Sequence, residues 1–184
     1  MHLPASVRNL VLVGFMGSGK SLVGREIARR CDLRFLDTDS VIRQRYGKSI
    51  GEIFAIHGEP AFREAEHQVL LRLRGARHLV IATGGGIVLQ PRNRLILRSI
   101  GPVVWLTADE EVIWERVSRN RNRPLLQTAD PRSTIRTLME VRNPLYREAA
   151  DIIVETSSFT HQEVANKILL ALRVWATKPH EDRN

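Results

Sequence analysis

The 184-residue sequence contains a single cysteine, Cys31, so no disulfide can form within the chain. A fold that does not depend on oxidation suits a reducing compartment, and we predict a cytoplasmic location. Long apolar runs are also missing, since the apolar stretch at residues 10–13 is far too short to cross a bilayer. Only Arg8 is charged before that stretch and no small-residue cleavage site follows it, so we expect no export signal and no membrane partner.

Clustered basic charge is the next feature that the sequence lacks. The formal net charge is +8, an excess that can attract nucleic acids. The arginines recur singly, however, and there is no run of five or more basic residues, no recognition signature and no basic strip interleaved with aromatic residues. We therefore expect the basic side chains to serve anionic small molecules and expect no nucleic-acid partner, with nucleic-acid binding kept as the alternative from a different class.

Short β-like runs alternate along the chain with segments of helical periodicity. The predicted strands are residues 10–13, 34–36, 79–83, 103–106 and 152–154. Helix starts are indicated by the capping-box pairs Ser49 with Glu52, Thr107 with Glu110 and Thr160 with Glu163, and by Pro91 in a first turn. Strands separated by helices predict an α/β fold with a parallel sheet covered on both faces. No repeat, low-complexity segment or linker interrupts the pattern, so residues 1–184 are predicted to form one domain with a polar tail at 178–184.

A phosphate-binding loop lies between the first predicted strand and the first predicted helix, where Leu22, Val23, Ile27 and Ala28 recur at helical spacing. The loop reads Gly14-Phe15-Met16-Gly17-Ser18-Gly19-Lys20-Ser21 and matches G-x-x-x-x-G-K-[ST] in full. Glycines let the backbone wrap phosphate oxygens with its N–H groups pointing inward, and the next helix presents its positive end to the same phosphates. Lys20 can contact the β- and γ-phosphates, and the Ser21 hydroxyl can bind Mg²⁺. The motif predicts phosphate binding.

Two acids follow the second predicted strand in the segment Asp37-Thr38-Asp39. Ligands of open α/β sheets bind beyond the carboxyl ends of the strands. Asp37 and Asp39 could therefore divide their work between a metal ion and a substrate hydroxyl. The alternative is that an aspartate at this position caps the following helix.

The predicted helix at residues 60–73 contains Arg63 and Glu66, which share one face. Glu66 can hold the guanidinium in one orientation, and an arginine so held can bind a carboxylate through two parallel hydrogen bonds. A solvated surface ion pair is the alternative. Further along, Gly84, Gly85 and Gly86 follow the third predicted strand directly. Three successive glycines remove side chains where another group approaches the backbone closely, which favours a binding surface over a simple turn.

These segments together resemble the shikimate kinase family. The shared motifs are the phosphate-binding loop, Asp37-Thr38-Asp39, Phe62-Arg63-x-x-Glu66, Ala82-Thr83-Gly84-Gly85-Gly86, Arg123-Pro124-Leu125-Leu126 and Arg142-Asn143-Pro144-Leu145-Tyr146. They occur in family order and spacing over residues 9–172. The resemblance implies a three-layer P-loop kinase fold of the nucleoside-monophosphate-kinase type, with a five-stranded parallel sheet in the order 2-3-1-4-5 flanked by helices. It also implies a substrate-binding region at residues 38–73 and a lid at residues 116–132.

The implied reaction transfers the γ-phosphoryl group of MgATP to the 3-hydroxyl of shikimate, on the route to chorismate and the aromatic amino acids. ATP is the co-substrate, Mg²⁺ is the metal, and a monomer is expected. The catalytic residues implied by the resemblance are Asp39, which binds the hydroxyls and accepts the proton, Lys20, and the lid arginine Arg123. The ATP-binding residues are Gly17, Ser18, Gly19, Lys20, Ser21 and Arg123. Ser21 and Asp37 would hold the metal.

The substrate residues implied by the resemblance are Asp39, Arg63, Gly84, Gly85, Gly86 and Arg142, with the two arginines on the carboxylate. One segment departs from the family pattern. Members often have a basic residue in the loop after the last strand, close to the adenine, but residues 155–159 contain neither lysine nor arginine. A nucleotide kinase and a gluconate-type sugar kinase remain the alternatives on the same fold.

Overall fold

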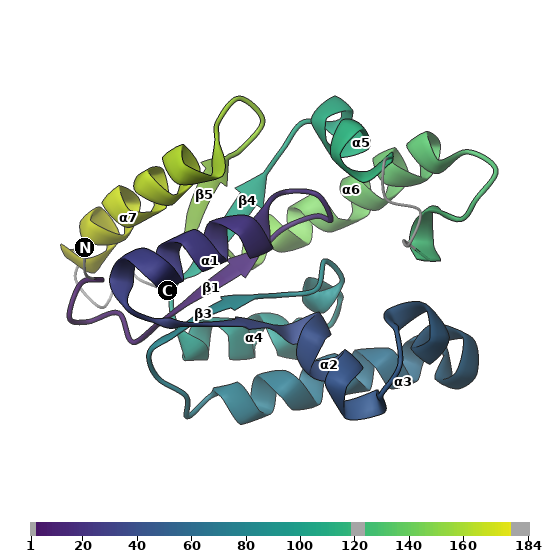
Figure 1. Ribbon diagram of the computed structural model, residues 1–184, viewed down its shortest axis with the longest axis horizontal. Helices are drawn as coiled ribbons and strands as arrows, with labels where there is room; N and C mark the ends of the chain where they lie inside the picture. The colour runs from purple at the N-terminus through teal and green to yellow at the C-terminus, as the bar shows by residue number, and fades with distance from the viewer. Residues whose placement is uncertain (1–2, 119–123, 178–184) are drawn as a thin grey trace.

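A computed structural model describes residues 3–118 and 124–177 of the chain. Five parallel strands form one sheet in the order β2-β3-β1-β4-β5 (Figure 1). The strands are β1 (Asn9–Val13), β2 (Arg34–Asp37), β3 (Leu79–Ala82), β4 (Val103–Thr107) and β5 (Ile152–Glu155). The predicted fold class and strand order are confirmed, and each predicted strand differs from the observed one by a single residue at one end.

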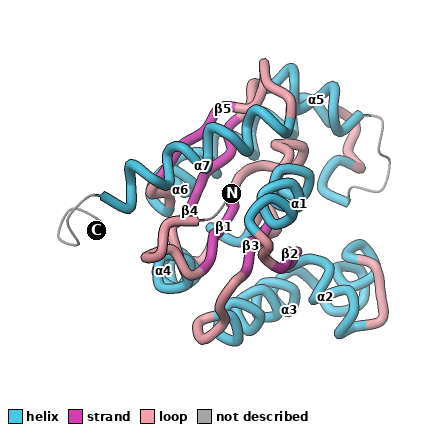
Figure 2. The backbone as a smooth tube through the Cα atoms, turned by 60° about the vertical axis from the view of Figure 1, so that its left-hand side comes forward, coloured by secondary structure: helices cyan, strands magenta, loops and turns pink. Residues whose placement is uncertain are grey.

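The described residues also form seven α-helices and two short 3₁₀ turns, and all but the last helix lie between strands in the chain. The helices are α1 (Lys20–Cys31), α2 (Thr38–Tyr46), α3 (Ile50–Leu73), α4 (Pro91–Ile100), α5 (Glu110–Ser118), α6 (Pro131–Ala149) and α7 (His161–Thr177), and the turns are η1 (Ile87–Leu89) and η2 (Pro124–Leu126). Helix α2 packs on α3 beside the sheet (Figure 2). No helix within the described ranges is long and apolar enough to span a membrane.

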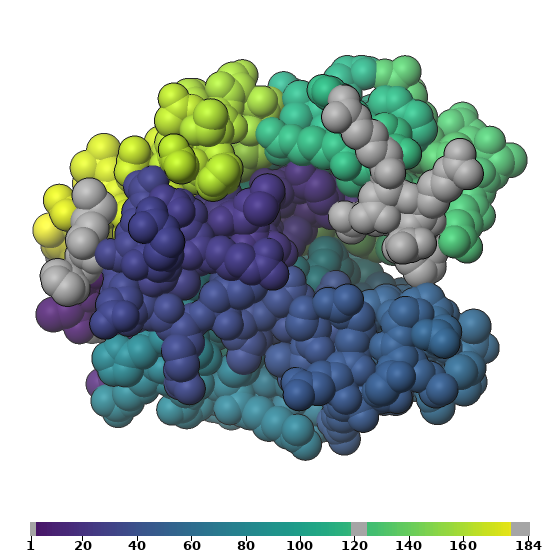
Figure 3. Space-filling view, in the orientation of Figure 1, coloured from purple at the N-terminus to yellow at the C-terminus, as the bar shows by residue number. Residues whose placement is uncertain are grey.

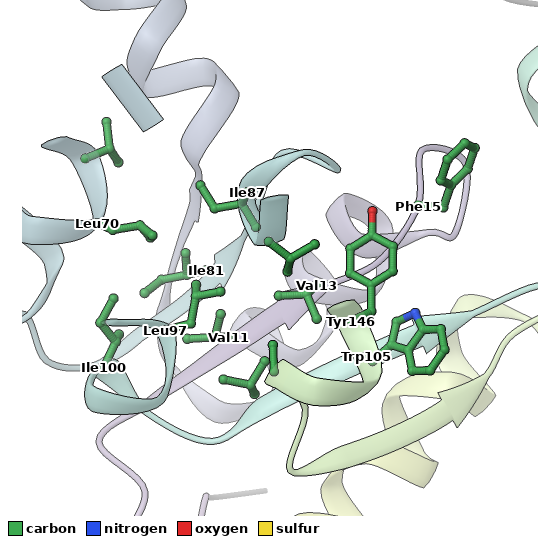
Figure 4. Close-up of a cluster of buried hydrophobic side chains, with 14 of the residues drawn as sticks. Val11, Val13, Phe15, Leu70, Ile81, Ile87, Leu97, Ile100, Trp105 and Tyr146 are labelled. Carbon is green, nitrogen blue, oxygen red and sulfur yellow. The ribbon is translucent and has the colours of Figure 1, made fainter. Parts of the chain in front are cut away.

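Alternating residues of the central strand divide the core into two layers. Leu10 and Leu12 point to one face, where they pack with residues of α1 and α7. Val11 and Val13 point to the other face and join residues of α3, α4, α5 and α6 (Figure 4). This alternation follows from the two-residue period of a strand. A central strand that is apolar on both faces therefore supports the three-layer arrangement expected from the sequence.

The helix starts agree with most of the predicted caps. Ser49 and Glu52 form a complete capping box, Thr160 and Glu163 exchange the same hydrogen bonds, and Pro91 lies in the first turn of α4. The cap predicted at Thr107 is wrong. Thr107 continues β4 by pairing with β5, and the first carbonyl to accept within α5 is that of Asp109.

Two features of the helices differ from the predicted pattern. Helix α3 runs without a break from the start predicted at Ser49 through the helix predicted at residues 60–73, and it kinks at Gly58, whose φ of 77° lies in the left-handed region. Pro60 follows the kink and begins the straight segment that the sequence indicated. In α1, Leu22 is 60% exposed and is not part of the core, contrary to its place in the predicted apolar pattern. It lines the large cleft described below.

Candidate active site

The segments that follow β1, β2 and β3 meet at the carboxyl edge of the sheet, where ligands of such folds bind. A cleft of about 1240 Å³ lies there, between the phosphate-binding loop, α2 and α5 (Figure 3). A second pocket, of about 170 Å³, adjoins it. Both are lined by Met16, Asp39, Ile50, Gly84 and Gly85. The edge therefore offers two connected compartments, which we call the nucleotide cleft and the acceptor pocket.

The phosphate-binding loop forms the floor of the nucleotide cleft, which Gly17, Ser18, Gly19, Lys20 and Ser21 all line. Gly14 has a φ of 143°, and a Cβ there would meet the carbonyl oxygen of Leu106 at 2.5 Å. Gly17 has a φ of 79°, and a Cβ there would meet Val117 at 2.8 Å. Only glycine fits both requirements at these two positions. The loop is thus held tightly between β4 and α5 before α1 begins.

Lys20 is almost fully buried beneath the loop. Its Nζ donates to the carbonyl oxygens of Gly14 and Phe15, each at 2.8 Å, and lies 3.5 Å from the Ser18 hydroxyl. These neutral acceptors hold the ammonium group at the cleft. Phosphate oxygens, which carry charge, are stronger acceptors for the same group.

Ser21 and Asp37 lie next to each other at the mouth of the loop. The Ser21 hydroxyl donates to Oδ2 of Asp37 at 3.0 Å, while Oδ1 of Asp37 accepts from the backbone N–H of Ser40 at 3.1 Å. One carboxylate therefore serves both interpretations of the sequence, since it caps α2 and also faces the serine. A hydroxyl and a carboxylate beside a phosphate loop fit Mg²⁺, which takes oxygen ligands and is commonly held by one or two carboxylates together with substrate phosphates.

Asp39 lies in the first turn of α2 and lines both compartments. Its Oδ1 is buried and has no hydrogen-bond partner among the residues that the structure describes. Burial raises the pKa of Asp39, and the charge of Asp37 adds to this effect, while Lys20, Arg43 and Arg63 oppose it. A buried carboxylate oxygen without a donor is costly. It is also well placed to accept a hydrogen bond from a hydroxyl group in the acceptor pocket.

Arg63 and Glu66 form a buried pair, so the interpretation of a solvated surface pair is wrong. Arg63 is 8% exposed and Glu66 is 0% exposed. The Arg63 Nη1 donates to Oε2 of Glu66 at 2.7 Å, and its Nε and Nη2 both donate to Oε1 of Glu59, at 3.0 and 2.7 Å. Burial raises the pKa of Glu66 to about 7, against the effect of Arg63. Glu59, which the sequence did not single out, completes the orientation of the guanidinium.

The three glycines after β3 make room for the protein's own side chains. A Cβ on Gly84 would lie 2.4 Å from Oδ1 of Asp39 and 2.9 Å from Oε1 of Glu66. A Cβ on Gly86 would lie 2.1 Å from Nη1 of Arg63. Around Gly85 the nearest atoms are 3.5 Å away, an ordinary contact distance. Close approach to the backbone was predicted, and at Gly84 and Gly86 the approaching groups are those of the site itself.

Arg142 enters the acceptor pocket from α6 and is 4% exposed. Its guanidinium lies over the ring of Phe15 at 5.8 Å. Arg63 lines the same pocket from α3, so two arginines from different helices face one small space. Oε1 of Glu66, like Oδ1 of Asp39, lacks a hydrogen-bond partner within the described part of the chain. The pocket therefore combines cations suited to an anionic group with free acceptors suited to hydroxyl groups.

Comparison with known proteins connects this geometry to one family. A sequence model described as shikimate kinase matches residues 16–173. The chain is 51% identical over 146 residues to a shikimate kinase of Aromatoleum aromaticum, covering 79% of this chain and 83% of the relative. It is 45% identical over 166 residues to a shikimate kinase of Burkholderia lata, covering 90% of each. The chain belongs to the shikimate kinase family. It is an ATP-dependent kinase.

A solved structure of the family shows the same fold. The shikimate kinase from Acinetobacter baumannii in complex with shikimate superposes with a TM-score of 0.90 at 40% identity, over 94% of this chain and 97% of that one. The family resemblance noted from the sequence motifs is therefore confirmed.

The lid expected in this family lies partly outside the described residues. Arg123, predicted to be catalytic and to bind ATP, falls in the undescribed residues 119–123, and the predicted polar tail at 178–184 also lies outside the described ranges. Within the rest of the segment predicted as a lid, Leu125 lines the acceptor pocket and Gln127 lines the nucleotide cleft. The described part of that segment thus contributes to both compartments.

The far end of the nucleotide cleft contains an arginine that the sequence analysis did not assign to the nucleotide site. Arg116, on α5, donates through Nη2 to the carbonyl oxygen of Thr156 at 2.9 Å and through Nη1 to that of Gly17 at 3.3 Å. It therefore joins the loop after β5, which has no basic residue of its own, to the phosphate-binding loop. The only signal for it was its position at the start of the predicted lid, because its partners are distant in the sequence.

Proposed function

We propose that this protein transfers the γ-phosphoryl group of MgATP to the 3-hydroxyl of shikimate and gives shikimate 3-phosphate and ADP. The observation that carries the proposal is the composition of the acceptor pocket. Arg63 and Arg142 offer two buried guanidinium groups for a carboxylate, and Oδ1 of Asp39, which has no partner in the described ranges, offers an acceptor for a hydroxyl. A small cyclic acid with hydroxyl groups satisfies both demands at once.

The reaction follows from the positions of these groups. Asp39 accepts a hydrogen bond from the acceptor hydroxyl and orients its oxygen toward the γ-phosphorus. As the new P–O bond forms, the bond to the β–γ bridging oxygen breaks, ADP leaves and the hydroxyl proton passes to Asp39. The raised pKa of Asp39 favours this transfer, because a base works best when its pKa approaches the working pH. Most of the acceleration comes from positioning and charge.

The residues that contact the phosphates are proposed to act through their charges. Lys20 would exchange its contacts with the Gly14 and Phe15 carbonyls for phosphate oxygens as the nucleotide binds. Ser21 and Asp37 would hold Mg²⁺, which, when bound, neutralises charge on the β- and γ-phosphates. Arg123 would reach the same phosphates from the lid.

Further predictions extend this proposal beyond the reaction itself. Residues 38–73 would form the substrate-binding region and residues 116–132 the lid of a single domain. We also expect a cytoplasmic monomer with no nucleic-acid partner.

An ADP-release assay across several acceptors tests the proposal. Shikimate, gluconate and nucleoside monophosphates are each supplied with MgATP, and we expect ADP release that depends on shikimate alone. Turnover with gluconate or a nucleotide in place of shikimate contradicts the proposal. Binding of nucleic acid with a steep salt dependence and no turnover would favour the alternative from the other class.

An analogue with a neutral hydroxymethyl group in place of the carboxylate tests the arginine assignment. The wild-type enzyme should use it poorly, because two desolvated guanidinium groups would then lack an anion. Arg63→Ala and Arg142→Ala should each lose about 2–4 kcal/mol of transition-state binding with shikimate and should discriminate less between the two compounds. Full preference for the acid in both variants would place the carboxylate elsewhere.

A further inference from the structure

Residues 84–87, which we call the glycine segment, follow β3 and begin with three glycines. These glycines have no side chains that could hold the backbone in place. Three side chains from other helices hold it instead. The Thr38 hydroxyl accepts from the N–H of Gly84 at 3.0 Å. The Tyr146 hydroxyl donates to the carbonyl oxygen of Gly85, and Nδ2 of Asn93 donates to the carbonyl oxygen of Ile87 at 3.0 Å.

These three side chains are buried and come from distant parts of the chain. Thr38 opens α2, Asn93 lies in the first turn of α4, and Tyr146 lies near the end of α6. Burial of a polar group destabilises the folded protein unless the group forms a hydrogen bond. Here each is paired with the backbone of the glycine segment, which makes that segment the shared partner of three helices.

The orientation of Asn93 is itself determined by a second buried side chain. Its Oδ1 lies 2.8 Å from Nδ1 of His67, the residue that follows Glu66 on α3. Since Nδ2 of Asn93 donates to Ile87, its Oδ1 is the acceptor and Nδ1 of His67 carries the proton. A fourth helix is therefore connected to the end of the glycine segment.

Tyr146 is the most constrained of the three. Its ring stacks on Trp105 with centroids 5.8 Å apart, and its hydroxyl points away from Trp105 (Figure 4). Burial raises the pKa of Tyr146 far above its ordinary value, although the neighbouring Arg142 opposes this, so the phenol remains a donor. Arg142 precedes Tyr146 by one helical turn on the same face of α6. The helix that supplies an arginine to the pocket thus also holds the glycine segment.

We propose that Thr38, Asn93 and Tyr146 are positioning residues of the acceptor pocket, which hold residues 84–87 at the distance that the substrate-binding side chains require. The inference rests on the proposed function. The backbone at Gly84 and Gly86 leaves too little space for a methyl group beside Asp39, Glu66 and Arg63. A shift of this backbone would therefore displace those three side chains or open gaps beside them.

Two variants of nearly unchanged shape test the proposal, because each removes one donor; Asn93→Asp also adds a buried charge. Tyr146→Phe keeps the stacked ring and loses the hydroxyl. Asn93→Asp keeps an acceptor for His67 and loses the donor to Ile87. We expect the KM for shikimate to rise about 5- to 50-fold in each, from an unpaired buried carbonyl, while the KM for ATP and kcat change less than about threefold. Steady-state kinetics with both substrates, together with the melting temperature, measure this split.

The matched control is Asn166→Asp, which changes an exposed asparagine of α7 that pairs with Arg30 on the opposite face of the sheet, and it should leave all constants unchanged. If Asn93→Asp fails to fold because of its buried charge, Tyr146→Phe decides the question. An unchanged KM for shikimate in folded Tyr146→Phe, or an equal rise in both KM values, overturns the inference and leaves the proposed function intact. Absence of shikimate turnover by the wild type overturns the proposed function and the inference with it.

Discussion

The nucleotide cleft and the acceptor pocket share an edge of the sheet but differ in how they satisfy their polar groups. In the nucleotide cleft, Lys20 bonds to loop carbonyls, and Ser21 bonds to Asp37. In the acceptor pocket, one oxygen of Asp39 and one of Glu66 are buried with no donor in the described part of the chain. The cleft can exchange existing partners for phosphates, whereas the pocket holds acceptors that a bound substrate would pair for the first time.

Asp37 and Asp39 show this contrast within one turn of chain. Both oxygens of Asp37 are hydrogen-bonded, one to Ser21 and one to the backbone of Ser40. Asp39 is half-buried, has a raised pKa, and has one buried oxygen that finds no hydrogen-bond partner among the described residues. We therefore expect ligand affinity in the cleft to come from the exchange of the present partners for charged phosphates, and ligand affinity in the pocket to come from relief of a desolvation cost.

The largest effect should follow from Lys20→Met in the nucleotide cleft. We expect kcat to fall about 10³-fold, at the upper end for the loss of one preorganised donor to developing charge. The circular dichroism spectrum should stay that of the wild type, because the side chain lines the cleft and belongs to neither hydrophobic cluster. Lys48→Met, on the exposed surface, is the control. A near-normal kcat would show that this loop is not the catalytic phosphate site.

The next largest effects should follow from substitution of the two aspartates, which are expected to act differently. Asp39→Asn should lower kcat at least ~10²-fold, the low end for general-base contributions. Asp37→Asn should act through the metal and recover part of its activity as the Mg²⁺ concentration rises. Measuring kcat and the KM for shikimate over a Mg²⁺ series separates the two. If Asp37→Asn weakens shikimate binding more than Asp39→Asn does, the roles assigned here to the two aspartates are reversed.

Variants of the three glycines test how closely the acceptor pocket is packed. Gly84→Ala and Gly86→Ala should raise the KM for shikimate at least about tenfold, because an added methyl group displaces Asp39, Glu66 or Arg63 in a packed site. Gly85→Ala should raise it less, since its Cβ finds ordinary contact distances. Kinetics of the three variants at saturating ATP make the comparison. The opposite order would mean that the substrate itself occupies the space above Gly85.

The smallest effect concerns stability rather than rate. Burial raises the pKa of Glu66 to about 7, so the folded chain holds a proton that the unfolded chain releases near its ordinary pKa of 4.5. The unfolding free energy contributed by this group should therefore fall as pH rises between those two values. Glu66→Gln should remove roughly 2–3 kcal/mol of that dependence, measured by urea unfolding across the window.

Glu64→Gln provides the control for this titration. Hydrogen bonds from Gln68 and Arg92 lower the pKa of Glu64, so its contribution has the opposite sign and is lost as pH falls. Parallel stability curves for the wild type and Glu66→Gln would argue that Glu66 stays ionised throughout.

The parallel α/β architecture and the phosphate-binding loop could be predicted from the sequence alone. Strands and helices are encoded in local periodicity, and residues 14–21 form one continuous motif whose function depends on neighbours in the chain. Predictions from local sequence patterns were wrong where a tertiary contact determined the structure. Thr107 was predicted as a cap but extends β4 because β5 pairs with it, and Leu22 belongs to a helical pattern but lines a cleft.

The assembly of the acceptor pocket, in contrast, depends on the packing of helices that are distant in the sequence. It buried Arg63 with Glu66, added Glu59, and placed the Tyr146 hydroxyl on Gly85, a residue 61 positions away in the chain. Arg116 reached Thr156 in the same manner. Burial and hydrogen-bond partners depend on which helices cover a strand end, and no local pattern of residues specifies that. The polar groups of the pocket therefore acquire their burial, their hydrogen-bond partners and their shifted pKa values only when the helices pack around the end of β3.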